Sequence, residues 1–396
     1  MKYFQGEFFN KFETNKNNII VDDEEINSKY MQGEVRIVTE QGRYPLPTLN
    51  GLFSDKKKYN MRPEFQRRRR WNNLKKSKLI ESFIINVPIP PVFLYEVDYA
   101  KFEVMDGLQR ISTIIDFYND KFALEGLEIW SELNGKKYSQ LPEKIVEGID
   151  RRYLSSIVLL NESAKSKEQA EFLKKIVFER LNSGGVKLSS QETRNALYDG
   201  PFNQLCIQLS NNEDFQELWE INQIDDKDLN ISDDLEESKS ELYRNMGDVE
   251  LVLRFFAFRF LDNYNYKLER FLDDFLKTGN KFTKKVFDNY GNLFSKTVEL
   301  ALLLFGENAF KQYKKVRGKW GWRDPSRLIY DPMMQVLSKY VDIVNDVCEK
   351  NLDKRIDELK KFYEEYEENF NGKKQSKVDI KTRIDLINSL ILKIIE

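Results

Sequence analysis

The sequence of 396 residues contains no histidine. Without histidine, these residues cannot form a Ser-His-Asp or Cys-His nucleophile system, an HExxH zinc site or a histidine-dependent HNH nuclease centre. Any chemistry in this chain must therefore use carboxylates, amides, hydroxyls, lysine, arginine or the backbone.

Cysteine and long apolar runs are also scarce. The two cysteines, Cys206 and Cys348, share no CxxC motif, which excludes a cysteine-rich zinc cluster, argues against a disulfide framework and fits a cytoplasmic location. The most apolar stretch, Val249 to Leu261, contains Arg254 and Arg259 and is too short and too charged to span a membrane. It predicts a core helix whose arginines are either paired or extend their charged ends to the surface, and the chain is expected to have no membrane partner.

Neither sign of charge dominates the chain as a whole, because 63 basic residues face 65 acidic ones. Local runs must therefore decide whether a polyanion is a partner. Between Asp55 and Lys78, eleven residues are basic and two are acidic, which favours a docking site for DNA phosphates. We predict that Arg68, Arg69 and Arg70 bind DNA. Alternatively, the run is a solvated face that balances the acidic residues 225–241.

A second basic segment, Lys311 to Arg327, contains seven basic residues, one acidic residue, one tyrosine and two tryptophans. Cations interleaved with rings that can stack are typical of nucleic-acid binding. We predict that Lys319 and Arg323 contact DNA. The same aromatic residues would serve equally well in a hydrophobic core.

The pattern of apolar residues predicts three regions. Residues 1–40 are polar and are expected to form a loosely held lead-in. Residues 41–200 alternate short strands and helices, which predicts an α+β domain. The expected elements are helices over 75–86, 111–118 and 167–181, strands over 92–97, 102–105 and 151–160, and a helix opened by the capping box Ser189 to Glu192.

Residues 201–396 show no strand signals and are expected to form an all-helical domain. Apolar residues repeat at helical spacing from Leu352 to Phe370 and again from Ile380 to Ile391. This predicts a helical hairpin at the end of the chain. Its apolar faces either pack within the chain or form a homo-oligomer or partner interface.

The sharpest motif is DGLQR at residues 106–110, between a predicted strand and a predicted helix. Gly107 permits a tight turn, and the free N–H groups at a helix start suit a phosphate. Arg110 could contact that phosphate in a bidentate manner, Gln109 could orient a water, and Asp106 could hold a metal ion or accept a proton. Asp106, Gln109 and Arg110 are therefore the candidate catalytic residues. Alternatively, Arg110 forms a salt bridge on an ordinary capped helix.

A further motif, FERLNSGG, occupies residues 178–185 at the end of a predicted helix. Paired glycines suit a loop that must approach a ligand or another loop closely. Alternatively, the motif is an ordinary helix end, which explains one glycine more readily than two.

The ordered set of motifs resembles the N-terminal domain of GmrSD-type restriction enzymes over roughly residues 40–260. The motifs are RPEFQR at 62–67 with Trp71, LIES at 79–82, PIPP at 88–91, DGLQR at 106–110 and FERLNSGG at 178–185. The resemblance implies a ParB/sulfiredoxin-like fold for residues 41–200. It also implies that this domain binds and hydrolyses an NTP (GTP, ATP, UTP or CTP) with Mg²⁺ and regulates the cleavage of modified phage DNA. The implied nucleotide site comprises Asp106, which would also hold the Mg²⁺, together with Gly107, Arg110, Gln66, Arg67 and Asn182.

Two departures from the family pattern shape the expected function. The family signature is DGQQR, and in this sequence Leu108 replaces its first glutamine. Many relatives also carry an HNH nuclease domain, which requires histidine, and these residues contain none. We therefore expect a DNA-sensing NTPase subunit of a phage-defence system whose nuclease is a separate chain. One alternative is a nucleotide-gated DNA-binding switch that does not hydrolyse. Another is a metal-dependent nuclease, although no clustered acidic motif of the two-metal type is present.

Overall fold

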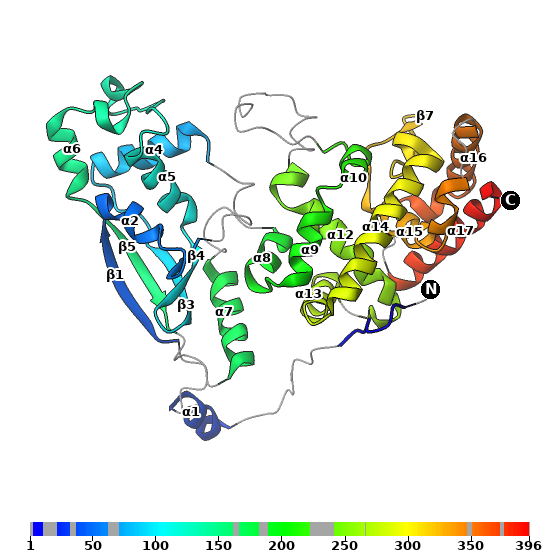
Figure 1. The fold of residues 1–396 in the computed structure, drawn as a ribbon, viewed down its shortest axis with the longest axis horizontal. Helices are drawn as coiled ribbons and strands as arrows, with labels where there is room; N and C mark the ends of the chain where they lie inside the picture. The colour runs from blue at the N-terminus through cyan, green and yellow to red at the C-terminus, as the bar shows by residue number, and fades with distance from the viewer. Residues whose placement is uncertain are drawn as a thin grey trace. The chain divides into compact units, whose positions relative to one another are not determined.

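The computed structural model describes residues 3–10, 22–31, 37–61, 71–160, 166–181, 189–221, 241–265, 267–346, 351–372 and 376–395 (Figure 1). The chain divides into two compact units. We call Asn15–Leu197 the sheet unit, and Met1–Thr14 together with Tyr198–Glu396 the helical unit. Within the described residues, no helix combines the length and apolar character needed to cross a membrane.

The sheet unit is built around a mixed five-stranded sheet with the order β1-β5-β3-β4-β2. The pairs β1/β5 and β3/β4 are antiparallel, and the pairs β3/β5 and β2/β4 are parallel. Its elements are α1 (Asp23–Met31), β1 (Thr39–Pro45), α2 (Leu49–Phe53), β2 (Tyr59–Asn60), α4 (Asn73–Ile84), β3 (Val92–Asp98), β4 (Lys101–Asp106), α5 (Leu108–Tyr118), α6 (Glu143–Asp150), β5 (Tyr153–Leu159), α7 (Lys167–Leu181) and α8 (Ser190–Leu197).

Side chains alternate between the two faces of this sheet, as strand geometry requires. Leu94 and Val104 point into the main core with α2, α4 and α5, whereas Met105 lies in a smaller cluster with Phe178 of α7. A buried ion pair also ties α7 to the sheet, because the Lys174 Nζ lies 2.9 Å from the Glu103 Oε2. Helices on both faces therefore hold β4, and with it the β4–α5 turn, in place.

The helical unit packs around α12, whose residues are almost all buried. Phenylalanine and tyrosine rings from α9, α12, α13 and α14 pack against one another in its core, mostly edge to face. Its elements are α9 (Pro201–Leu209), α10 (Glu213–Leu218), α12 (Gly247–Ala257), η5 (Phe258–Asn263), α13 (Leu268–Gly279), α14 (Lys284–Phe305), β6 (Tyr313–Val316), β7 (Lys319–Trp322), α15 (Arg327–Leu337), α16 (Leu352–Glu365) and α17 (Lys377–Ile395).

The α+β class and the main elements of residues 71–197 are confirmed. The helices and strands expected there occur as α4, β3, β4, α5, β5 and α7, within a few residues at each end. The capping box of α8 is also present, because the Glu192 N–H donates to the Ser189 Oγ and the Ser189 N–H to the Glu192 Oε2. The ParB/sulfiredoxin-like topology stays a prediction.

The expectation of an all-helical region beyond residue 200 is wrong at one place. The segment Tyr313 to Trp322 forms a two-stranded antiparallel ribbon, β6–β7. The strands were not predicted because lysines occupy positions on both faces and obscure the alternation of apolar and polar residues. A two-residue turn at Arg317 and Gly318 connects the two strands. At the end of the chain α17 packs chiefly along α15 and to a lesser extent along α16. Apolar positions such as Leu359 and Ile387 are buried within the chain itself.

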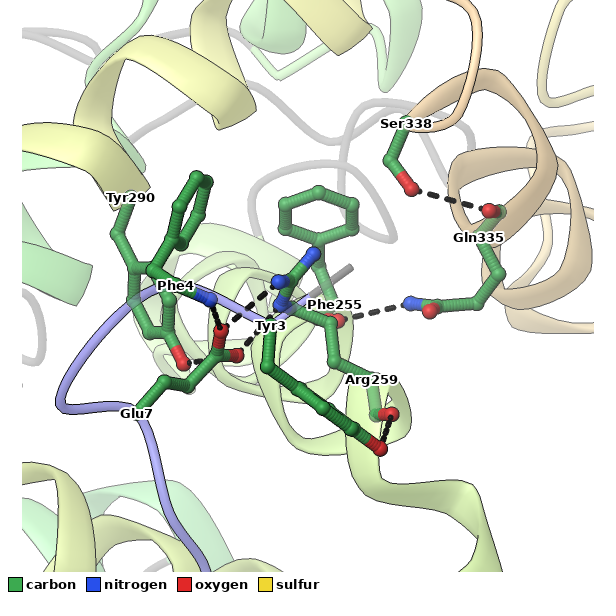
Figure 2. A network of polar contacts seen from close by, with 8 residues as sticks. All are labelled: Tyr3, Phe4, Glu7, Phe255, Arg259, Tyr290, Gln335 and Ser338. Carbon is green, nitrogen blue, oxygen red and sulfur yellow. Dashed lines mark hydrogen bonds and ion pairs between the residues drawn. The ribbon is translucent and has the colours of Figure 1, made fainter. Parts of the chain in front are cut away.

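The first residues also differ from the expected loose lead-in, because they pack into the helical unit (Figure 2). The Glu7 carboxylate accepts hydrogen bonds from the Arg259 Nε at 2.7 Å and from the Tyr290 hydroxyl at 2.7 Å. Burial and the charge of Glu7 raise the pKa of Tyr290. The rings of Tyr3 and Phe9 lie against Phe260 and its neighbours. This short segment is thus held in place by residues far from it in the sequence.

Candidate functional site

The β4–α5 turn carries the DGLQR motif and begins with a left-handed glycine. Asp106 ends β4, and Gly107 has φ +95° and serves as the N-cap of α5. A Cβ at Gly107 would collide with the Val92 side chain and would lie 2.9 Å from the Arg110 Nη2. Glycine is therefore required here both by the backbone conformation and by the close approach of its neighbours.

The helix that follows begins directly at the turn. The Ile111 N–H donates to the Gly107 carbonyl at 3.0 Å, so the N–H groups before it have no acceptor within the helix itself. These groups and the helix dipole create a positive potential at the start of α5. The turn thus meets the backbone requirement for holding an anionic oxygen.

The far end of α5 is anchored by a tyrosine pair. The hydroxyl groups of Tyr118 and Tyr138 both donate to the Asp150 Oδ1, at 2.8 and 2.9 Å. Burial and the hydrogen bond to Asp150 raise the pKa of Tyr138 to about 12 and that of Tyr118 further. Both groups therefore stay protonated donors at neutral pH, and they tie α5 to α6.

Asp106 and Arg110 form an ion pair across the turn. The Arg110 Nη2 lies 2.6 Å from the Asp106 Oδ2 and also donates to the Pro91 carbonyl at 3.3 Å. The Arg110 side chain is 15% exposed, whereas that of Asp106 is 48% exposed. The salt bridge considered as an alternative from the sequence is thus present in this structure.

One nitrogen of the Arg110 guanidinium takes no part in these contacts. Its Nε is buried and has no hydrogen-bond partner among the residues that the structure describes. Such an unsatisfied buried donor is costly, and an incoming acceptor would relieve that cost. Arg110 is therefore oriented by Asp106 and Pro91 but is not fully satisfied by them.

Gln109 connects the turn to the chain before α4. Its Oε1 accepts a hydrogen bond from the Trp71 N–H at 3.3 Å. Neither this contact nor that of the Pro91 carbonyl with Arg110 was predicted from the sequence. The signal was available in part, because Trp71 and Pro91 both belong to motifs that carry the resemblance.

Several predicted residues lie outside the described residues. They are Gln66, Arg67, Arg68, Arg69, Arg70 and Asn182, together with most of the acidic segment 225–241 and Cys348. Of the predicted nucleotide and catalytic residues, the structure thus brings together Asp106, Gly107, Gln109 and Arg110. The predicted DNA contacts Lys319 and Arg323 belong to the helical unit and are both exposed.

The donors at the turn suit one divalent cation more than a metal cluster. Asp106 offers a half-exposed carboxylate of the type that Mg²⁺ prefers, usually with waters and phosphate oxygens completing the shell. Among the described residues there is no group of three or more Cys, Asp or Glu side chains placed to hold a metal ion.

Comparison with known proteins identifies the segment that carries this turn. Residues 49–198 match the family described as GmrSD restriction endonuclease, N-terminal domain. The resemblance seen in the motifs is thereby confirmed for this segment, which ends one residue beyond the sheet unit. The match does not extend to residue 260, where the resemblance was expected to end. No curated protein and no solved structure matches the chain.

Proposed function

We propose that this chain, whose residues 49–198 form a GmrSD-type restriction enzyme N-terminal domain, is a nucleotide-responsive regulatory component of a phage-defence restriction system. In this proposal the β4–α5 turn binds the phosphates of an NTP and promotes its hydrolysis with Mg²⁺. The observation that carries the proposal is the Asp106–Arg110 pair, set on a left-handed glycine at the start of a helix within the matched segment.

The pair supplies both charges that a magnesium–nucleotide complex needs. Arg110 would exchange its contact with Asp106 for a phosphate, a charge-assisted interaction of similar strength. Asp106 would then be free to bind Mg²⁺, which is the chemistry that offsets phosphate charge during phosphoryl transfer. The left-handed turn at Gly107 starts α5, whose first backbone N–H groups would bind the phosphate.

Three further residues belong to the proposed nucleotide site. Gln66 and Arg67 precede Trp71 by five and four residues in the sequence, and Trp71 is hydrogen-bonded to Gln109 of the motif. Asn182 follows α7 directly. We propose that these side chains complete the contacts to the nucleotide.

The nuclease activity of such a system would reside elsewhere. An HNH centre needs histidine, and these 396 residues contain none. We therefore propose that this chain senses DNA and nucleotide, while cleavage is performed by another chain or by sequence outside these residues.

A second candidate function is a nucleotide-gated switch that binds but does not hydrolyse. The observation that favours it is the engagement of the Gln109 Oε1 by the Trp71 N–H, because an amide used in this way is less available to orient an attacking water. Phosphate release, measured with and without duplex DNA, separates the two functions. Turnover that rises with DNA supports hydrolysis, whereas binding without turnover supports the switch.

The central test is nucleotide binding by Arg110→Ala, measured by titration calorimetry with a non-hydrolysable NTP and Mg²⁺. Losing a charge-assisted hydrogen bond costs about 1.5–3 kcal/mol, which corresponds to roughly 10- to 150-fold weaker binding. The matched control is Arg151→Ala, which removes an exposed arginine of the same unit at the end of α6.

The control should bind like the unmodified chain. Equal affinities for all three proteins would overturn the assignment of the site. Nicking of plasmid DNA by the purified chain, if abolished by Asp106→Ala, would instead support a metal-dependent nuclease.

A further inference from the structure

The ribbon β6–β7 of the helical unit ends in a short tip. Its register pairs Val316 with Lys319, so that Arg317 and Gly318 form a two-residue loop. Both loop residues have positive φ, +50° and +83°. Turns of this kind match the right-handed twist of the two strands, so the strands stay paired up to the turn.

The two faces of the ribbon differ in character. Because opposed residues share a face, Tyr313 and Trp322 lie on the same face as Trp320. Tyr313 stacks on Trp320 with ring centroids 5.5 Å apart, and Trp322 meets Tyr363 of α16 edge-on. These half-buried rings contact one another and Tyr363, which favours the packing role that the sequence left open beside base stacking.

The other face and the tip carry unpaired cations. Lys314 and Lys319 lie on the face opposite the rings, and Arg317 lies in the turn. Together with Lys315 and Arg323, they form no ion pair with any other described residue. By contrast, the nearby Lys311 is paired with Glu220 at 2.8 Å and with Glu307 at 3.4 Å.

Some cations of this region are therefore paired with carboxylates, whereas those of the ribbon are not paired with any described residue. Asp324, beside Arg323 in the sequence, is the one acidic residue between Lys311 and Arg327, and it is exposed. The cations of the ribbon offer only donors, and a row of phosphate oxygens offers only acceptors. Cations clustered without nearby carboxylates repel one another, and binding of a polyanion relieves that repulsion.

We propose that the tip of β6–β7 enters a groove of duplex DNA, with Lys314, Arg317 and Lys319 binding backbone phosphates. This inference rests on the proposed DNA-sensing function and assigns it a surface. A major groove about 12 Å wide admits a two-stranded ribbon whose strands lie about 4.8 Å apart. Duplex DNA is favoured over single strands because the aromatic rings that would stack on bases are already packed.

Phosphate contacts carry no direct sequence information. The ribbon should therefore bind different duplexes with similar affinity. Sequence or modification selectivity would have to come from another part of the system.

The test is the salt dependence of duplex binding by the full chain, measured by fluorescence anisotropy with a labelled 20-base-pair duplex and no nucleotide. The ribbon variant combines Lys314→Gln, Arg317→Gln and Lys319→Gln. Each lost phosphate contact should reduce the slope of log affinity against log salt by about 0.9.

A matched control combines Lys284→Gln, Lys285→Gln and Lys354→Gln, exposed residues of the same unit with the same total charge. Its slope should equal that of the unmodified chain. An unchanged slope in the ribbon variant, or an equal fall in both variants, would overturn the proposal. Tighter binding to a single strand of the same length would also overturn it.

The two proposals fail separately. Arg110→Ala should leave the duplex slope unchanged, because that measurement contains no nucleotide. Loss of nucleotide binding in Arg110→Ala together with an unchanged slope in the ribbon variant would reject the ribbon and retain the nucleotide site. Should the triple variant be poorly folded by circular dichroism, Lys319→Glu alone, at an exposed position, must still lower the slope.

Discussion

Two carboxylate–guanidinium pairs in this molecule have similar geometry but opposite environments. In the sheet unit, the Arg110 Nη2 lies 2.6 Å from the Asp106 Oδ2, and the Asp106 side chain is 48% exposed. In the helical unit, the Arg259 Nε lies 2.7 Å from the Glu7 Oε1, and those side chains are 2% and 0% exposed. The first pair can exchange its partners with water or a ligand, whereas the second is sealed from solvent.

The partners around each pair reinforce this difference. The Glu7 carboxylate also accepts hydrogen bonds from the Phe4 N–H and the Tyr290 hydroxyl, so its oxygens are fully used (Figure 2). Asp106 makes one ion-pair contact, and Arg110 keeps a buried Nε without a partner among the described residues. An ion pair alone is thus a poor guide to function. The exposure of the two side chains and their unused hydrogen-bonding groups distinguish an ion pair in a binding site from one that only stabilises the fold.

The largest effect should come from breaking the sealed pair with Arg259→Ala. This change leaves the Glu7 carboxylate buried without its cation and should lower the free energy of unfolding by about 3–5 kcal/mol. Urea unfolding followed by circular dichroism measures it, using the transition of the helical unit if the two units unfold separately. Nucleotide affinity should not change while the protein is folded.

Lys381→Ala provides the matched control for that experiment. It removes an ion pair with Asp262 whose side chains are 49% and 77% exposed, so the loss should be at most about 1 kcal/mol. Equal losses in the two variants would show that burial of the Glu7–Arg259 pair makes no difference.

The same contrast explains what the sequence could and could not predict. The β4–α5 turn is local, since Asp106-Gly107 and the apolar spacing after it lie within one short stretch, and it was predicted correctly. The buried ion pair of Glu7, in contrast, depends on Arg259, which lies 252 residues away in the sequence. No local sequence pattern predicts that partner. A signal existed in the aromatic residues at positions 3, 4, 8 and 9, which a loosely held tail has no need for.

Strands at the edges were also missed for physical reasons. β1 is the polar segment TEQGRYP with no buried residue, and it is a strand because β5 pairs with it along its whole length. β2 is only two residues long and pairs with β4. For Arg110, in contrast, a salt bridge was foreseen as one of two possibilities without a named partner, and the structure shows that the partner is Asp106, four residues before it.

A smaller loss of stability is expected from Gly107→Ala, which would displace the Asp106–Arg110 pair. A left-handed conformation costs a residue with a Cβ about 1–3 kcal/mol. Here the Cβ also meets the Val92 side chain and would press on the Arg110 Nη2. We expect reduced stability in thermal unfolding and weaker nucleotide binding in calorimetry.

Gly135→Ala separates the two causes. Gly135 has φ +82° in the same unit, but a Cβ there would meet no atom within 4 Å. It should show the backbone cost alone and unchanged nucleotide affinity. Equal nucleotide binding by the two variants would argue against a role for the close approach at Gly107.

The smallest change in stability, and the sharpest test of exchange, is expected from Asp106→Asn. Because Asp106 is half exposed, losing its ion pair should cost at most about 1 kcal/mol of stability. Without Mg²⁺ the variant should bind an NTP more tightly, since a negative charge about 4 Å from a phosphate opposes binding in water by about 1 kcal/mol, or roughly fivefold. With Mg²⁺ the sign should reverse, because the carboxylate proposed to hold the ion is gone. Calorimetry with EDTA and then with Mg²⁺ measures both arms, and Asp98→Asn is the control, since it breaks an exposed pair with Lys101 elsewhere in the same unit. An affinity that responds to Asp106→Asn in the same direction with and without Mg²⁺ would show that Asp106 acts only as the partner of Arg110 and not as a ligand for the cation.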